Sequence, residues 1–280
     1  MKNILYIILF IVLVGCKSKP VELSIMTYNI RMDTPYDSIN SWPYRKDVAA
    51  EVIKNHDIDI LGAQEVLVNQ LNDLKERLPE YNTIGVGRED GKEKGEFSII
   101  FYKKNRFDEI ESGNFWLSET PELAGSKGWD AACERIATWT VLKEKKSGKQ
   151  LFFLNTHLDH IGTIARSESI KLILEKCEDL SKDYPVIITG DFNSIPESTV
   201  IGKVLETEKY LDSRQIAAQI SGNYGTYHEY GRFIEEDRDL IDYIFVSKGI
   251  KVNHYEVLPD KHNGTYLSDH VPVIAEIIIE

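Results

Sequence analysis

A carboxylate and a carboxamide follow an apolar run in the stretch VIITGDFNSIP, residues 186–196. Asp191 and Asn193 are two positions apart, and residues i and i+2 of an extended chain point to the same side. We therefore expect both side chains to reach toward the same space, where oxygen donors of this kind suit Mg²⁺ or Mn²⁺. Gly, Asp, Asn, Ser and Pro also favour turns, so the loop taken alone fits a plain turn equally well.

Comparable polar residues stand at the ends of other apolar runs. Asp242 interrupts the run LIDYIF, where a charge is costly unless it is paired or binds a metal ion. Several such groups at strand ends indicate one site at the edge of a sheet, where ligand sites commonly lie. The groups are Asn29; Glu65; Asn155, His157 and Asp159; Asp191 and Asn193; Asp242; and Ser268, Asp269 and His270.

The residue types narrow the chemistry. The sequence has no Cys/His cluster with zinc spacing, no Gly-x-Ser-x-Gly motif and no Gly-rich phosphate loop that ends in Lys-Ser or Lys-Thr. Histidines close to carboxylates offer acid–base capacity and phosphate contacts. A hard cation, a His–Asp pair and no protein nucleophile indicate attack by water with the help of a metal ion. Hydrolysis of a phosphoric ester is the reaction class that this set favours.

The elements that must position these residues form a mixed α/β pattern. Apolar stripes at helical spacing predict three helices. Short β-branched and aromatic runs predict strands between and after them. The segment at 116–129, WLSETPELAGSKGW, is either a substrate-facing loop or a place where two tryptophans pack into the core. The predicted helices are 42–55, 69–78 and 163–180, and the predicted strands are 23–30, 58–63, 97–102, 135–142, 151–158, 186–189, 240–246 and 271–279.

The N-terminus resembles a bacterial export signal. Lys2 is followed by an apolar run over residues 4–14, which is short for a membrane span but suits a signal peptide. The sequence LVGC, residues 13–16, matches a lipoprotein cleavage site, so we predict a signal peptide at 1–15 and lipidation of Cys16. A tether at 16–21 and one domain at 22–280 would follow. Acyl chains would then anchor an extracytoplasmic, periplasm-facing domain to a membrane.

Charge and cysteine content limit the remaining classes. The formal net charge is −12, and no basic run marks a surface for long duplex DNA. Nucleic acid is therefore a possible but not a favoured partner. Besides Cys16, only Cys133 and Cys177 are present, and two distant cysteines do not predict a disulfide.

The ordered motifs TYNIR, QE, RIATW, NTHLDH, GDFN, DYIF and SDHVPV resemble those of the endonuclease/exonuclease/phosphatase superfamily. The resemblance covers residues 22–280, and GDFN and SDH are the two most specific motifs. It implies an α/β (α+β) fold, a four-layer sandwich in which two mixed β-sheets pack face to face with helices outside. It also implies Mg²⁺ or Mn²⁺ as cofactor and a phosphoester as substrate, and we expect the chain to be a monomer.

The resemblance assigns roles to individual residues. Glu65 would be the main metal ligand with Asn29 beside it, and Asp269 would bind a metal or lie near a second one. Asp191 would orient or deprotonate the attacking water. Phosphate contacts would come from Arg135, Asn193, His157 and His270, and Asp242 would hold the His270 ring.

Some positions depart from the family pattern or have another interpretation. Arg31 stands where some members carry an Asp, which puts a two-metal mechanism in doubt. Asp159 and His160 receive no role. Arg135 could instead form a salt bridge at the sheet edge, and His157 could be a core histidine.

The leading functional hypothesis is a Mg²⁺-dependent phosphodiesterase or phosphatase that acts on a small or lipid-derived phosphoester. The alternative is an extracytoplasmic nuclease for DNA or RNA, because the fold does not set the substrate. A lipoprotein that binds phosphate without cleaving it is a third possibility.

Overall fold

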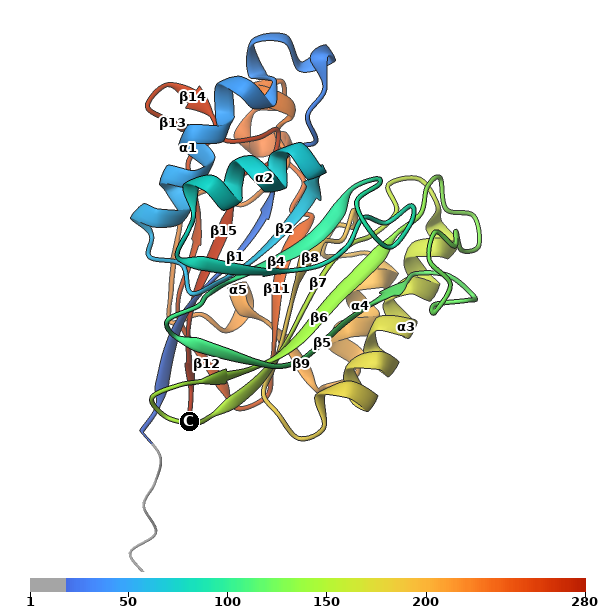
Figure 1. Ribbon diagram of the computed structural model, residues 1–280, viewed down its shortest axis with the longest axis vertical. Coiled ribbons are helices and arrows are strands. Elements are labelled where there is room, and N and C mark those ends of the chain that lie inside the picture. The colour runs from blue at the N-terminus through green and yellow to red at the C-terminus, as the bar shows by residue number, and fades with distance from the viewer. Residues whose placement is uncertain (1–18) are drawn as a thin grey trace, which may run out of the picture.

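Two mixed β-sheets pack face to face at the centre of the molecule, as Figure 1 shows for the computed structural model. The structure describes residues 19–280. The predicted signal peptide and Cys16 lie outside the described residues, and the boundaries of tether and domain stay predictions. The two sheets with helices on their outer faces confirm the four-layer sandwich expected from the sequence.

The first sheet has seven strands and carries the strand that begins the described fold. Its order is β10-β12-β15-β1-β2-β4-β3. Strand β1 lies parallel to β2 and antiparallel to β15, and its first residue Val21 pairs with Ile279 near the C-terminus. The strands are β1 (Val21–Asn29), β2 (Ile60–Val66), β3 (Tyr81–Ile84), β4 (Phe97–Lys103), β10 (Gln219–Ser221), β12 (Ile250–Val257) and β15 (Val273–Ile279).

The second sheet has six strands in the order β5-β6-β7-β8-β11-β9. Only the β7–β8 pair is parallel, and the other neighbours are antiparallel. A small separate hairpin joins β13 (Lys261–His262) to β14 (Thr265–Tyr266). The six strands are β5 (Phe107–Trp116), β6 (Ile136–Glu144), β7 (Gln150–His157), β8 (Val186–Asp191), β9 (Tyr210–Asp212) and β11 (Asp242–Ser247).

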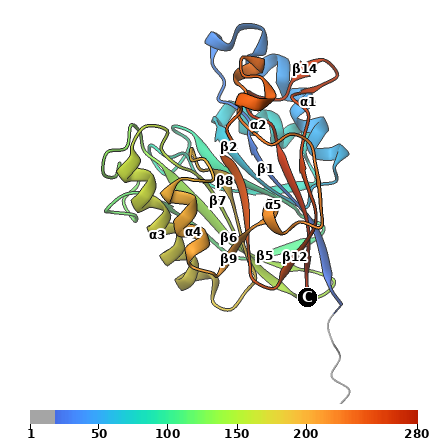
Figure 2. The same cartoon turned by 180° about the vertical axis from the view of Figure 1, so that it is seen from behind.

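Helices cover the outer face of each sheet. Helices α1 (Trp42–Asn55) and α2 (Val68–Arg77) pack on the first sheet, and α3 (Thr163–Ser181) and α4 (Thr199–Glu206) pack on the second. Figure 2 shows α3 and α4 side by side on their sheet, seen from behind. None of the helices within residues 19–280 combines the length and apolar character that crossing a membrane requires. The short elements are α5 (Ser213–Ile216) and the 3₁₀ turns η1 (Pro35–Asn40), η2 (Glu229–Gly231) and η3 (Glu235–Asp237).

The alternation of side chains along the strands explains why polar residues gather at one end. In β1, Leu23 and Ile25 face the other sheet, whereas Met26 and Tyr28 face the helices. Successive side chains of a strand point to opposite faces, so Asn29 falls on the face between the sheets. The same count places the strand-end residues His157, Asp191 and Asp242 on that face, above Phe153, Ile187 and Ile244.

A layer of buried polar side chains joins the sheets beneath these strand ends. The Asn155 amide donates to the carbonyls of Ala63 and Ile99, and its Oδ1 accepts from Gln64 Nε2 at 2.6 Å and Thr189 Oγ1 at 3.1 Å. Gly62 makes the close approach possible, because a Cβ there would lie 2.2 Å from Thr189 Oγ1. Buried polar groups need partners, and this network supplies them across both sheets. It sets how the two sheets meet directly under the candidate site.

Several elements were not predicted from the sequence. Strand β5 was missed because residues 108–112 are exposed and mostly charged or polar, so the strand lacks a clear apolar alternation. Strands β3, β9, β10 and β12 and helix α4 were missed as well. In the segment 116–129, Trp116 is buried and its Nε1 donates to the Arg88 carbonyl, so this tryptophan is packed core.

Candidate active site

Three ionisable side chains form one row across the second sheet. Strands β7 and β8 pair His157 with Asp191, and β8 and β11 pair Asp191 with Asp242. Neighbouring strands lie about 5 Å apart, so adjacent members of the row are within reach of one another. His157 Nε2 lies 3.5 Å from Asp191 Oδ2. The register of the sheet therefore places the Asp191 carboxylate between an imidazole and a second carboxylate.

Asn29 connects this row to the other sheet. Its Nδ2 donates to Asp191 Oδ2 at 3.0 Å and to Glu65 Oε1 at 3.0 Å. Its Oδ1 accepts from the backbone N–H of Arg31. Asn29 thus lies beside Glu65, as expected, but it presents donors to both carboxylates, and its metal-ligand role stays a prediction.

Glu65 lies at a register shift in the β2–β4 pairing, between Ala63 and Val66. Its φ is +60°, a conformation that non-glycine residues adopt only when surrounding contacts compensate. The backbone N–H of Met32 donates to Oε2 at 3.0 Å. Burial acts to raise the pKa of Glu65, but the hydrogen bonds from Asn29 and Met32 outweigh it and hold the pKa below its ordinary value. Glu65 therefore stays ionised, as a metal ligand must.

His270 and Asp242 form a buried ion pair. His270 Nδ1 lies 2.9 Å from Asp242 Oδ2, and His270 Nε2 lies 3.7 Å from Asp191 Oδ2. Burial lowers the pKa of His270, but Asp242 and Asp191 outweigh burial and raise the pKa to about 10. His270 is therefore a cation at neutral pH, with Nδ1–H directed at Asp242 and Nε2–H directed into the site.

His157 has the opposite character. Burial, with Arg135 and Arg88 nearby, holds the pKa of His157 well below its ordinary value. Asn193 donates from Nδ2 to His157 Nε2 at 3.1 Å and to the Leu158 carbonyl at 3.0 Å. His157 is therefore a neutral imidazole that accepts at Nε2 and carries its proton on Nδ1.

Asp191 and Asn193 converge as their spacing predicted. Asn193 has a φ of +45°, and its backbone N–H donates to Asp191 Oδ1 at 2.9 Å. Burial and the neighbouring Asp242 raise the pKa of Asp191 to about 7, against the opposing effect of the His270 cation. A buried carboxylate with a pKa near neutrality is suited to take a proton from water.

The donor set fits a hard divalent cation. Glu65 and Asp269 face the same space, and the side chain of Arg31 lies between them. Behind them lie Asp191 and Asp242, within 4.8 Å of the His270 ring, which as a cation pairs with these carboxylates and offers no ligand atom itself. Asp242 Oδ1 is buried and has no hydrogen-bond partner in the described part of the chain. Oxygen-rich and partly unpartnered donors of this kind suit Mg²⁺ or Mn²⁺.

Three further charged residues line the site, and two of them, Glu96 and Arg88, were not singled out from the sequence. Glu96 lies immediately before β4 and pairs with both terminal nitrogens of Arg88 at 2.7 Å. Arg135 Nη1 lies 4.0 Å from the same Glu96 carboxylate. Arg135 Nε and Nη1 are buried without hydrogen-bond partners within residues 19–280. That leaves donors for an anion on Arg135, and its phosphate-binding role stays a prediction.

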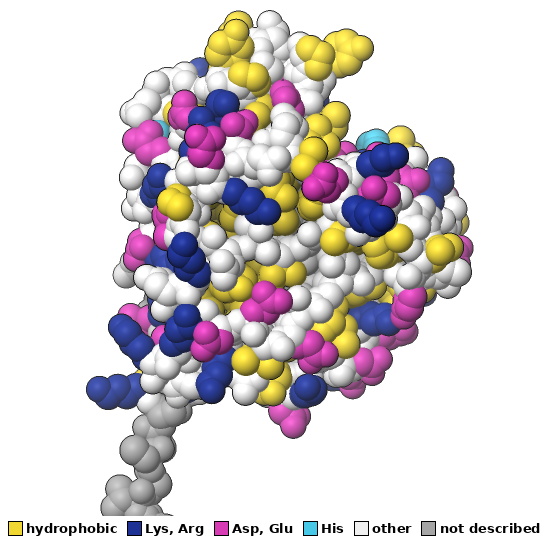
Figure 3. All heavy atoms as spheres, in the orientation of Figure 1, with side chains coloured by type: hydrophobic (Ala, Val, Ile, Leu, Met, Phe, Trp, Pro, Cys, Tyr) yellow, Lys and Arg dark blue, Asp and Glu magenta, His cyan; other side chains and the backbone are white. Residues whose placement is uncertain are grey.

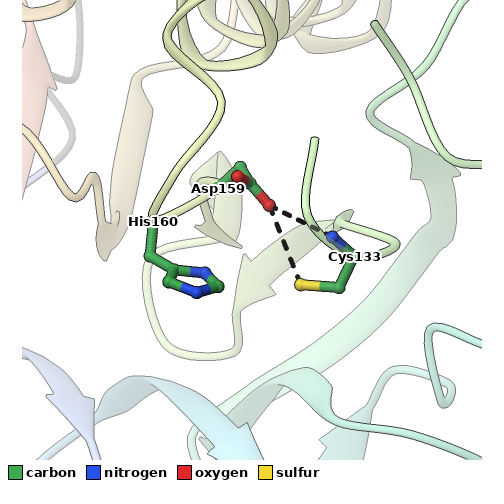
Figure 4. Close-up of side chains that lie close together, drawn as sticks. All are labelled: Cys133, Asp159 and His160. Carbon is green, nitrogen blue, oxygen red and sulfur yellow. Dashed lines mark hydrogen bonds between the residues drawn. The ribbon is translucent and has the colours of Figure 1, made fainter. Parts of the chain in front are cut away.

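His160 lines the cavity, and its neighbour Asp159 is buried; Figure 4 shows both side chains together with Cys133. Four backbone N–H groups donate to the Asp159 carboxylate, from residues 132, 133, 161 and 162. Burial acts to raise the pKa of Asp159, but these bonds and Arg135 outweigh it and lower the pKa to about 2. Asp159 therefore orders the loops, whereas His160 Nδ1 accepts from Arg135 Nη2 at 3.1 Å and faces the pocket. Cys133 and Cys177 are free thiols.

These residues enclose a cavity of about 490 Å³ between the strand ends. The residues that line it include Glu65, Asp191, Asp269, His270, Arg88, Glu96, Cys133, Arg135 and His160. Most of the residues predicted from the sequence to act in catalysis, phosphate binding or metal binding line this cavity. The two that do not, Asn29 and Asp242, are hydrogen-bonded to the lining residues Glu65 and His270. Glu96 was not predicted as a site residue because it belongs to no motif and is distinguished only by its position before a strand.

The comparisons with known proteins agree with this geometry. The model of the Endonuclease/Exonuclease/phosphatase family matches residues 26–270. A Bacteroides vulgatus structure of that description is 42% identical with a TM-score of 0.90 and covers 93% of this chain and 100% of its own. A mannosyl-6-phosphatase from Bacteroides thetaiotaomicron VPI-5482 is 41% identical with a TM-score of 0.87, covering 91% of this chain and 99% of its own.

A curated relative points to a different activity within the same fold. The CCR4-Not complex 3'-5'-exoribonuclease subunit Ccr4 of Mycosarcoma maydis is 22% identical over 340 residues, covering 92% of this chain. This chain spans only 51% of that protein, about half of its length.

Proposed function

The chain belongs to the endonuclease/exonuclease/phosphatase family, and we propose that it is a Mg²⁺- or Mn²⁺-dependent phosphatase that hydrolyses sugar phosphate monoesters. Members of this family are hydrolases of phosphoester bonds. The observation that carries the proposal is the Asp191 carboxylate, held between His157 and Asp242 and hydrogen-bonded to Asn29. The dependence on a divalent metal ion and the preference for a sugar phosphate are proposals.

The residues of the site suit attack by water on phosphorus. Asp191, with a pKa of about 7, takes a proton from the attacking water as its oxygen bonds to phosphorus. The ester P–O bond breaks on the opposite side, and the departing oxygen takes a proton from solvent water and leaves as an alcohol, while Asp191 returns its proton to solvent. The His270 cation directs its Nε2–H toward the phosphate oxygens, and Asp242 fixes the ring.

The remaining residues would hold the phosphate and the metal ion. Arg135 supplies N–H donors for phosphate oxygens, and an arginine fork matches phosphate geometry. Asn193, whose two amide N–H groups donate to His157 and the Leu158 carbonyl, would hold His157 in place beside the phosphate. Glu65 would hold the divalent cation, which when bound stabilises the negative charge that develops on the phosphate. Donors arranged before the reaction act strongly here because the site is buried.

A sugar phosphate is proposed as the substrate because of the charged residues that line the cavity and the similarity to the mannosyl-6-phosphatase. Arg88, Glu96 and His160 offer hydrogen-bond donors and acceptors in the same cavity as Asp191. Hydroxyl groups of a sugar donate to carboxylates and accept from guanidinium groups, so these residues suit a polyhydroxyl leaving group. The cavity volume of about 490 Å³ lies within the range of small-molecule sites.

A ribonuclease is the second candidate because the Ccr4 relatives are exoribonucleases. The charge pattern favours it less. The net charge is −12, and on the face in Figure 3 basic and acidic side chains are interspersed without a continuous basic area. Binding to a nucleic acid backbone relies on such an area.

We further propose that the domain is extracytoplasmic and anchored through Cys16. Strand β1 begins at the end of the sheet that also holds the C-terminus, and the site lies at the other end of β1, roughly 26 Å away at the rise of a strand. A short tether would then turn the site away from the membrane. This arrangement favours a soluble sugar phosphate over a lipid head group.

The test is hydrolysis by the purified chain with Mg²⁺, Mn²⁺ or EDTA. The substrates are mannose 6-phosphate, other sugar 6-phosphates, p-nitrophenyl phosphate, bis-p-nitrophenyl phosphate, sphingomyelin and a short RNA. We expect release of inorganic phosphate from sugar monoesters, abolished by EDTA. Preferential shortening of RNA would replace the phosphatase by the nuclease, and unchanged hydrolysis in EDTA would overturn the metal requirement.

A further inference from the structure

We propose that the guanidinium of Arg31 is a built-in cation at the Glu65 and Asp269 carboxylates and takes the place of a second divalent ion. The chain would then bind one divalent cation, on the Glu65 side of the site. Asp269 would be the counter-ion of Arg31 rather than a metal ligand. This inference rests on the proposed metal-dependent function and deepens it.

The backbone of Arg31 is fixed by contacts to both sides. Its φ is +58°, and its N–H donates to Asn29 Oδ1 at 3.0 Å. Its carbonyl accepts from Gln70 Nε2 at 2.8 Å and from Arg45 Nη2 at 3.3 Å. Arg45 is fully buried, and its Nη1 also binds the Ile30 carbonyl. A residue held in this region of φ is retained only where such contacts determine it.

The orientation of the Arg31 side chain is also fixed by hydrogen bonds. Arg31 Nε and Nη2 both donate to Asp37, at 3.1 and 3.2 Å, in a two-pronged contact. Tyr230 Oη donates to the same carboxylate at 3.1 Å and supports it from the other side. Two of the three guanidinium nitrogens are thus engaged outside the metal-binding space. The third, Nη1, is the one directed toward Glu65 and Asp269.

The position of Nη1 determines what else can bind there. It lies 3.6 Å from Asp269 Oδ2 and 4.0 Å from Glu65 Oε2. A Mg²⁺ ion that joined these two carboxylates would need oxygen ligands at about 2.0–2.1 Å and would occupy the space next to Nη1. Two positive groups so close repel strongly in a buried site. Arg31 supplies one positive charge at these carboxylates without any ion.

The opposite side of Glu65 carries no arginine, although the His270 cation lies beyond it with Nε2 3.7 Å from Asp191 Oδ2. Glu65 Oε1 faces Asn29 and, beyond it, Asp191. An ion on that side would have the Glu65 carboxylate and the Asp191 row around it, with the guanidinium on the far side of Glu65. The geometry therefore separates one cation position for a metal from one that belongs to Arg31.

The experiment counts Mn²⁺ ions bound per chain, by electron paramagnetic resonance and by isothermal titration calorimetry. We expect one ion for the wild-type chain and two for Arg31→Asp. In Arg31→Lys, which keeps a positive charge, we expect one. Arg232→Asp makes the same charge change at an exposed arginine that pairs only locally with Glu229 and should also bind one ion.

A second variant guards against misfolding. Removal of Arg31 leaves Asp37 opposite a new carboxylate, so Arg31→Asp combined with Asp37→Asn relieves that repulsion and should also bind two ions. Thermal unfolding verifies that each variant is folded. Two ions on the wild type, or one on both aspartate variants, would overturn the inference. Metal-dependent hydrolysis with two ions refutes the role of Arg31 alone, whereas a chain that binds no ion refutes the proposed function as well.

Discussion

The imidazole of His270 and the carboxylate of Asp242 lie 2.9 Å apart in a buried pair, although 28 residues separate them in the chain. Asp242 begins β11, and His270 lies in the loop before β15, so the pair joins strands of both sheets. The ring is thereby fixed with its other nitrogen toward Asp191. Asp242 is in this sense a positioning residue that acts through His270.

Asp242→Asn should lower kcat by about 10- to 100-fold, because the ring loses its charged partner. The same substitution in a His270→Gln background should cost little further activity, since Asp242 would have no ring left to position. A double-mutant cycle measures this coupling. Equal losses in both backgrounds would contradict a role that passes through His270.

Glu65→Gln should abolish tight Mn²⁺ binding and lower kcat/KM by at least about 100-fold, equivalent to about 2.7 kcal/mol of transition-state stabilisation. The amide keeps the shape of the side chain but removes the charge that a hard cation requires. Calorimetric titration with Mn²⁺ reports binding independently of turnover. Glu175→Gln, an exposed position on α3, is the matched control and should behave as wild type.

Glu96→Gln should reduce kcat/KM for sugar phosphates by about 10-fold and leave hydrolysis of p-nitrophenyl phosphate nearly unchanged. Loss of one charged hydrogen-bond acceptor for the leaving group accounts for a change of that size. The ratio of the two activities is the measurement. A similar fall for both substrates would mean that Glu96 supports the phosphate side of the site, through Arg135 or His157.

Asn155→Ala should destabilise the fold by about 2–4 kcal/mol, because it removes the donors to the buried carbonyls of Ala63 and Ile99 and one acceptor of the Gln64 amide. Denaturant unfolding measures the change. Asn105→Ala, at an exposed position, should change stability by less than about 0.5 kcal/mol. A small effect at Asn155 would show that water or a rearranged Gln64 replaces the lost bonds.

Asp159 predicts a specific dependence of stability on pH. Its pKa is lowered from 3.8 to about 2 in the folded chain, so ionised Asp159 stabilises the fold above pH 3.8. That contribution is lost as pH falls from about 4 toward 2. The difference in unfolding free energy between wild type and Asp159→Asn should therefore be constant from pH 5 to 7 and shrink at lower pH. A difference that stays constant down to pH 2 would exclude the ionised form as its source.

The sequence alone contained the residue types and order of the site. Apolar runs that end in Asn29, Glu65, His157, Asp191 and Asp242 predicted strands and a site at their ends, because strand alternation and the cost of unpaired charge are local properties. The same motifs predicted the two-sheet sandwich. The strands without such runs were missed, β5 among them, because its exposed positions carry charge.

The tertiary structure decided how those residues meet. Strand register set the row from His157 through Asp191 to Asp242, and it depends on pairings between distant segments. The sheet contact at Gly62 and Asn155 brought Asn29 within reach of Asp191. Packing also recruited Glu96 and Arg88, and it turned Arg31 toward Glu65 and Asp269. Residue identity determines which interactions a side chain can make, but burial and long-range contacts determine its partners and protonation state.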